Sequence, residues 1–124
     1  MEIQQIVREK YGAAALRLSS GGSSCCGASA ALDGPAMIDA VSGWVDQFPM
    51  FSVEDGLSED DWEHWPLLRE RIGGKALVLG DDLLCTNPSR IRRAIEANAA
   101  DALLLKVNQI GSLTEALEAF SLAR

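Results

Sequence analysis

The chain has 124 residues, of which 48% are hydrophobic and 23% are charged, and its formal net charge is −7. These values are ordinary for one modest globular domain, and the excess of acidic residues opposes a phosphate backbone, so nucleic acid is not an expected partner. No apolar run approaches the ~18 residues that span a bilayer, and the N-terminus lacks a signal-peptide pattern, so we expect a cytoplasmic protein with no membrane partner.

Residues 1–34 are predicted to form a helix followed by a linker. Apolar residues recur at helical spacing over residues 2–18. Residues 19–31 are mostly Gly, Ser, Ala and Cys, which bury little surface and lose much conformational entropy when ordered. Adjacent Cys25 and Cys26 lie in this linker, and a total of three cysteines fits a reducing compartment better than a disulfide scaffold.

The second predicted domain, residues 35–124, begins with a helix. Asp33 has the chemistry of an N-cap, and Pro35 suits the first turn. The apolar face of this helix is predicted to consist of Met37, Ile38, Val41, Trp44, Val45 and Phe48.

Three strand–helix units follow in the sequence. The strands are predicted at residues 50–53, 76–79 and 102–105, each a short continuous apolar run of the kind that is covered on both faces of a sheet. Ser58 and Asp61 are candidate caps for a helix over residues 62–72, although Pro66 favours a later start. Asn87 caps the next helix, and Ser112 with Glu115 forms a capping box for the last, whose apolar face is Leu113, Leu117 and Phe120. The pattern predicts an α/β fold of three parallel βα units preceded by one or two helices.

Charged residues stand at the end of each predicted strand: Glu54, Asp81 and Lys106. The carboxyl ends of parallel strands share one edge, so these side chains are expected to lie together. Two carboxylates there suit Mg²⁺, and a lysine beside a divalent ion can lose its proton and act as a base. The alternative is that these charges end the strands and meet water.

The segments around these positions resemble enolase. Residues 51–62 read Phe-Ser-Val-Glu-Asp-Gly-Leu-Ser-Glu-Asp-Asp-Trp and are similar to its S-[IV]-E-D-x-x-x-E-D-D-W motif. Residues 79–88 read Leu-Gly-Asp-Asp-Leu-Leu-Cys-Thr-Asn-Pro, similar to V-G-D-D-L-x-V-T-N-P. Residues 104–115 read Leu-Leu-Lys-Val-Asn-Gln-Ile-Gly-Ser-Leu-Thr-Glu, similar to L-[IL]-K-V-N-Q-I-G-[TS]-L-[TS]-E. The resemblance covers residues 35–124 and implies a partial TIM barrel.

The resemblance implies a glycolytic lyase chemistry at this edge. Glu54 and Asp81 would be Mg²⁺ ligands, and Lys106 would be the base that removes the proton α to the carboxylate of 2-phosphoglycerate, giving phosphoenolpyruvate. A weakly acidic C–H needs concentrated positive charge where the anion develops, which fits this assignment.

Several parts of the enolase pattern have no counterpart in these residues. They are the capping domain with its mobile loop, the acid-side glutamates, the His-Arg-Ser phosphate-binding segment and a second lysine. Asp33 precedes a helix and lies too close to Glu54 to serve as the third metal ligand. Since three βα units do not close an eight-stranded barrel, we expect no dehydration by this chain alone, and whether it is an enzyme stays open.

Residues 5–30 resemble the N-terminal lead-in of arsenite methyltransferases, on Val7–Gly12 and the Ser-Ser-Cys-Cys-Gly of residues 23–27. A soft ion such as arsenite or zinc could bind Cys25 and Cys26, although ordinary linker thiols are the alternative. The two resemblances together suggest a gene fusion. A further alternative is a non-catalytic homo-oligomer that covers exposed sheet surface. His64 and the basic cluster Arg90, Arg92 and Arg93 are expected on solvated helix surfaces.

Overall fold

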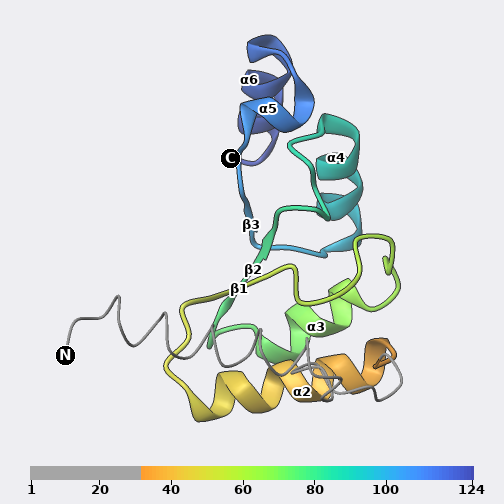
Figure 1. Cartoon of the computed structure of the whole chain (residues 1–124), viewed down its shortest axis with the longest axis vertical. Coiled ribbons are helices and arrows are strands. Elements are labelled where there is room, and N and C mark those ends of the chain that lie inside the picture. Colours follow the sequence, from red (N-terminus) through yellow and green to blue (C-terminus); the bar gives the residue numbers. More distant parts are fainter. Residues whose placement is uncertain (1–31) are drawn as a thin grey trace, which may run out of the picture. The chain divides into compact units, whose positions relative to one another are not determined.

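The computed structural model describes residues 32–124, which form one compact unit. The predicted N-terminal helix, the linker and the Cys25–Cys26 pair lie outside the described residues. The described unit is an α/β fold with three parallel strands, as the sequence predicts (Figure 1).

The sheet has the order β1-β2-β3, the order of the strands in the sequence. Strand β1 (Ser52–Glu54) pairs with β2 (Leu77–Gly80), and β2 pairs with β3 (Ala102–Leu103). Each strand is followed by helix: α3 (Trp65–Ile72) after β1, α4 (Pro88–Ala97) after β2, and α5 (Val107–Ile110) with α6 (Leu113–Leu122) after β3. Helix α2 (Gly34–Gln47) precedes the sheet. Among residues 32–124 the sheet does not close, so the architecture is a partial barrel.

Three of the predicted helix caps are confirmed. The side chain of Asp33 accepts a hydrogen bond from the amide of Ala36 at 3.0 Å, which identifies Asp33 as the cap of α2. Asn87 accepts from the amide of Ser89 at 2.9 Å, and Ser112 from that of Glu115 at 3.3 Å. Each bond satisfies an amide that the first helical turn leaves without an acceptor.

The predicted cap of α3 is wrong. The helix begins at Trp65, and its N-cap is His64 rather than Ser58 or Asp61. Pro66 stands in the first turn, where its missing N–H costs nothing, so the later start that Pro66 favours is confirmed.

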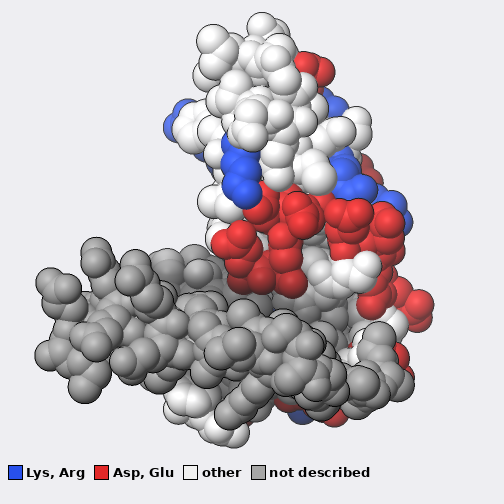
Figure 2. Space-filling model, viewed as in Figure 1, with Lys and Arg blue, Asp and Glu red and all other residues white. Residues whose placement is uncertain are grey.

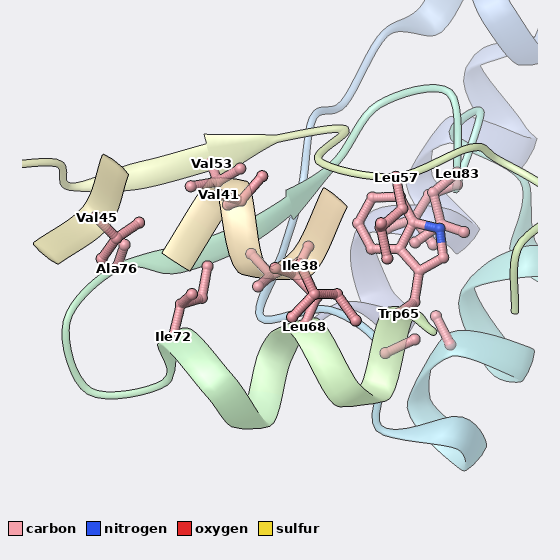
Figure 3. Close-up of a cluster of buried hydrophobic side chains, with 14 of the residues drawn as sticks. Ile38, Val41, Val45, Val53, Leu57, Trp65, Leu68, Ile72, Ala76 and Leu83 are labelled. Atoms are coloured by element: carbon pink, nitrogen blue, oxygen red, sulfur yellow. The ribbon is translucent and has the colours of Figure 1, made fainter. Parts of the chain in front are cut away.

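The core lies between the sheet and helices α2 and α3. Figure 3 shows Val53 of β1 facing Val41 of α2, and Ile72 and Leu68 of α3 below them. Trp65 and Leu68 of α3 and Val78 of β2 are fully buried. Burial of large apolar side chains stabilises a fold by roughly 1.5–3 kcal/mol each, so this cluster fixes β1 and β2 against their helices.

Two predicted helix faces are wrong in part. On α2, Ile38, Val41 and Val45 are buried, but Trp44 is 51% exposed and Phe48, which follows the helix, is 59% exposed. On α6, the buried residues are Ala116 and Ala119, whereas the large residues of the predicted face are exposed: Leu113, Leu117 and Phe120. Small residues allow α6 to pack closely against α4, and the large apolar stripe therefore lies to one side of that contact.

Within residues 32–124, β1 and β2 are buried on one face only, so the prediction of two covered faces is wrong for these two strands. Burial alternates along β2, where Val78 is fully buried and Leu77 is 40% exposed. Val53 and Val78 belong to the core cluster that includes buried residues of α2 and α3, so these helices cover the face that Val78 presents. No helix within residues 32–124 combines the length and the hydropathy needed to cross a bilayer.

Candidate functional site

The three charged residues predicted to share one edge do lie together. Glu54 is the last residue of β1, Asp81 follows the last residue of β2, and Lys106 lies three residues beyond β3. The parallel register pairs Glu54 with Leu79 and Gly80 with Leu103, which brings the carboxyl ends of the three strands to the same edge of the sheet. Figure 2 shows acidic side chains gathered on this face, with basic side chains beside them.

Asp81 and Lys106 form an ion pair. The Lys106 ammonium donates to Asp81 Oδ2, and the Asp81 side chain is only 10% exposed. The hydrogen bond with Lys106 lowers the pKa of Asp81 below its usual range, and the same bond raises the pKa of Lys106. Both groups are therefore held in their charged forms, and Lys106 is protonated while it faces this carboxylate.

Glu54 and Asp81, with Asp55, offer carboxylate oxygens that lie within 4.8 Å of one another. Oxygen donors of this kind suit a hard cation such as Mg²⁺. Glu54 is exposed, and within residues 32–124 its carboxylate is in no ion pair, so a ligand role for it would break none. Asp81 has both oxygens engaged by donors, but each carboxylate oxygen has a second lone pair. The carboxylates of Glu54 and Asp81 therefore fit a magnesium ion, with Lys106 as the competing cation.

Asp55 serves the backbone rather than the open edge. Its Oδ1 accepts from the amide of Asp81 at 3.0 Å, and its Oδ2 accepts from the amide of Asp82 at 2.9 Å. Its own φ is +44°, a left-handed conformation that Asp tolerates better than most residues. Asp55 thus joins the end of β1 to the turn that carries Asp81, and we assign it to that turn rather than to the metal.

Two further polar residues at the site were missed by the sequence analysis. Gln109 Nε2 donates to Asp81 Oδ1 at 2.7 Å, and Thr86 Oγ1 accepts from the amide of Lys106 at 2.9 Å. Gln109 could have been found from its spacing, because residues three apart in a helical turn lie on the same side. Nothing in the sequence marks Thr86, whose place depends on an irregular turn.

The remaining candidates lie away from this edge. His64 Nδ1 is 2.7 Å from Asp61 Oδ1, and this hydrogen bond raises the pKa of the imidazole. The basic cluster is less solvated than predicted, because Arg90 donates to the carbonyls of Leu83 and Glu59, and Arg93 lies 4.1 Å from the ring centre of Trp62. Burial raises the pKa of the Cys85 thiol, which disfavours a reactive thiolate.

The model of the family described as the C-terminal TIM barrel domain of enolase matches residues 8–124. The match includes the whole described unit and begins well before residue 35, where the sequence resemblance begins.

Proposed function

Since this chain belongs to the enolase C-terminal TIM barrel family, we propose that its strand edge is the metal-binding and proton-abstracting part of an enolase-type site. The reaction would be the Mg²⁺-dependent dehydration of 2-phosphoglycerate to phosphoenolpyruvate in the cytoplasm. The observation that carries this proposal is the contact of the Asp81 carboxylate with the Lys106 amine, next to the exposed carboxylate of Glu54.

Each residue has a role that its position supports. Glu54 and Asp81 would hold the cation, which when bound supplies positive charge where the substrate anion develops. Lys106 would accept the proton, and it must first be unprotonated. Its contact with Asp81 works against that, since an adjacent carboxylate favours the ammonium form. Lys106 is therefore a base only when the charge of Asp81 is compensated.

We further propose that this chain does not turn over by itself. The 124 residues contain a single histidine, His64, which lies with Asp61 rather than at this edge, and no counterpart of the acid-side glutamates. When catalytic groups act as a unit, removal of some of them lowers the rate far more than an equal division of the rate enhancement among the groups would suggest. A phosphorylated carboxylate would have a cation and a base here, without a general acid or a phosphate clamp.

Two measurements test this proposal. Titration with Mg²⁺, or with Mn²⁺ as a paramagnetic probe, should show weak binding that Glu54→Gln and Asp81→Asn each reduce at least about tenfold. Asp46→Asn is the matched control, since it removes an exposed carboxylate of α2. Equal affinity in all four proteins would reject the metal site. Phosphoenolpyruvate formation that Lys106→Ala abolishes would reject the proposed inactivity.

A second candidate function is self-association, favoured by the exposed apolar side chains. Leu113 is 70% exposed and Leu117 is 65% exposed on one face of α6, and Phe51 is 82% exposed beside β1. Both outer edges of the sheet also have unpaired backbone groups among the described residues. Sedimentation velocity on the full chain tests this candidate, since a monomer at all concentrations would reject it.

A further inference from the structure

Gln109 connects Asp81 to a residue deep in the fold. It belongs to α5 and donates from Nε2 to Asp81 Oδ1 at 2.7 Å. Its Oε1 lies 3.1 Å from the hydroxyl of Thr86. Gln109 is partly buried, so these bonds are shielded from water and less easily exchanged for it.

Thr86 is fully buried and has a strained backbone. Its exposed fraction is 0%, and its φ is +52°, a left-handed value that β-branched residues rarely adopt. Cys85 before it is also left-handed, with φ of +48°. Strain of this kind persists only where the surroundings impose it, and it concentrates at functional sites. The turn places the Thr86 hydroxyl between the amide of Lys106 and the side chain of Gln109.

The hydrogen bonds that link the Lys106 amide, Thr86, Gln109 and Asp81 form a chain in which each donor and acceptor role is fixed. The Thr86 hydroxyl accepts from the Lys106 amide and keeps its own proton for donation. Of its two acceptors, Gln109 Oε1 at 3.1 Å is nearer than the Leu104 carbonyl oxygen at 3.5 Å. With its oxygen used in this way, Gln109 must present its amide nitrogen to Asp81, which as a carboxylate only accepts. Lys106 therefore contacts Asp81 twice, directly through its ammonium and indirectly from its backbone amide through Thr86 and Gln109.

The geometry points to Thr86 and Gln109 as positioning residues that hold the Asp81 carboxylate in one rotamer, with Oδ1 on Gln109 and Oδ2 left for Lys106. A carboxylate attached by a single flexible ammonium could rotate about χ1, whereas one held at both oxygens cannot do so without losing a bond. The inference deepens the proposed function, because it concerns the same site. It requires neither a cation nor turnover, so the two can fail separately.

The test is the χ1 rotamer of Asp81, measured by NMR in the full chain. Three-bond couplings from the Asp81 carboxyl carbon to its backbone nitrogen and carbonyl carbon report the rotamer populations. Thr86→Val removes the hydroxyl and keeps the branched shape, while Thr86→Ser keeps the hydroxyl. Gln109→Met removes both amide bonds with little change of volume. We expect Thr86→Val and Gln109→Met to raise the minor rotamers about two- to tenfold, as loss of one typical hydrogen bond would. Thr86→Ser should keep the couplings of the unaltered chain.

Ile72→Val is the control for a general loss of stability, because it trims the core at α3, away from this edge. It should leave the Asp81 couplings unchanged. Unchanged couplings in Gln109→Met would overturn the inference. Minor-rotamer populations of Asp81 that rise as much in Ile72→Val as in Gln109→Met would also overturn it. If Thr86→Val does not fold, the partly buried Gln109→Met decides the question by itself.

Discussion

Single residues at the strand edge have separate tasks, and Asp55 shows the separation most clearly. It is adjacent to Glu54 in the sequence, yet its carboxylate accepts from the amides of Asp81 and Asp82 while that of Glu54 is exposed. A search by residue type alone would have grouped the two acids as metal ligands. The hydrogen-bond partners decide the matter: Asp55 follows the last residue of β1, and its φ of +44° directs its carboxylate to the amides of the turn that carries Asp81.

Replacement of Asp55 should therefore destabilise the fold. Asp55→Ala leaves two amides of the β2–α4 turn without their acceptor and puts alanine at φ of +44°, so we expect a loss of about 1–3 kcal/mol in the free energy of unfolding. Asp55→Asn keeps one carbonyl oxygen and a residue that tolerates this φ, so it should lose less. Urea denaturation measures both.

The neighbouring Asp82→Ala is the control for Asp55, since Asp82 is exposed. Its unfolding free energy should stay within about 0.5 kcal/mol of that of the unaltered chain. Equal losses in Asp55→Ala and Asp82→Ala would show that charge, rather than the amide contacts, is responsible.

His64 should make stability depend on pH near neutrality. Its hydrogen bond with Asp61 raises the pKa of the imidazole in the folded chain above 6.5. The stabilisation is then fully present below the unfolded pKa and is lost as pH rises through the folded value. Unfolding midpoints measured from about pH 6 to about pH 8.5 should fall for the unaltered chain more than for His64→Gln. A slope that is the same in both proteins would contradict this assignment.

The sequence located Glu54, Asp81 and Lys106 correctly at one edge because each follows a recognisable apolar strand, and parallel strands end together. It could not locate Thr86 or the contacts of Asp55. Both residues lie in left-handed turns, and such turns redirect side chains in ways that strand or helix periodicity does not describe.

At the scale of elements, helix starts were predictable where a local hydrogen bond decides them, as at Asp33, Asn87 and Ser112. Which face of a helix is buried was harder to predict. The large apolar residues of α6 suggested the wrong face, because tight packing against α4 selects the small residues Ala116 and Ala119. Periodicity identifies an apolar stripe, but the neighbouring element decides which stripe is buried.

Close packing also explains a glycine at the end of β2. A Cβ atom on Gly80 would lie 2.7 Å from Leu84 Cγ and 2.9 Å from Leu84 Cδ1, with Leu83 also near. Gly80→Ala should therefore displace the turn that carries Asp81, and we expect it to destabilise the fold by about 1–3 kcal/mol. Thermal and urea unfolding measure the effect.

Gly43 in α2 provides a control of opposite sign. A Cβ atom there would meet nothing within 4 Å, and alanine favours a helix interior over glycine. Gly43→Ala should therefore stabilise the fold by about 0.5–1 kcal/mol. The two substitutions add the same methyl group, so a destabilising Gly43→Ala would show that the available space is not what separates the sites.

At the scale of the whole molecule, exposed apolar surface and net charge oppose each other. The face of α6 formed by Leu113, Leu117 and Phe120 favours contact between copies, while a net charge of −7 on each chain repels them. Salt distinguishes the two contributions. It screens repulsion between exposed charges, with a Debye length that falls from about 10 Å at 0.1 M to about 3 Å at 1 M, and it leaves the burial of apolar surface intact.

Self-association through the α6 face should therefore strengthen as salt is added. Sedimentation equilibrium from about 0.05 M to about 0.5 M NaCl should show a falling dissociation constant for the unaltered chain. Leu117→Gln should weaken association about tenfold or more at every salt concentration, because it replaces an apolar side chain at the centre of the contact with one that stays hydrated. Thr114→Gln, also on α6 but outside that set of large apolar residues, should have little effect. If association weakened with salt instead, ion pairs such as those of Arg71 and Lys75 would be its cause, and the apolar face of α6 would not be the contact.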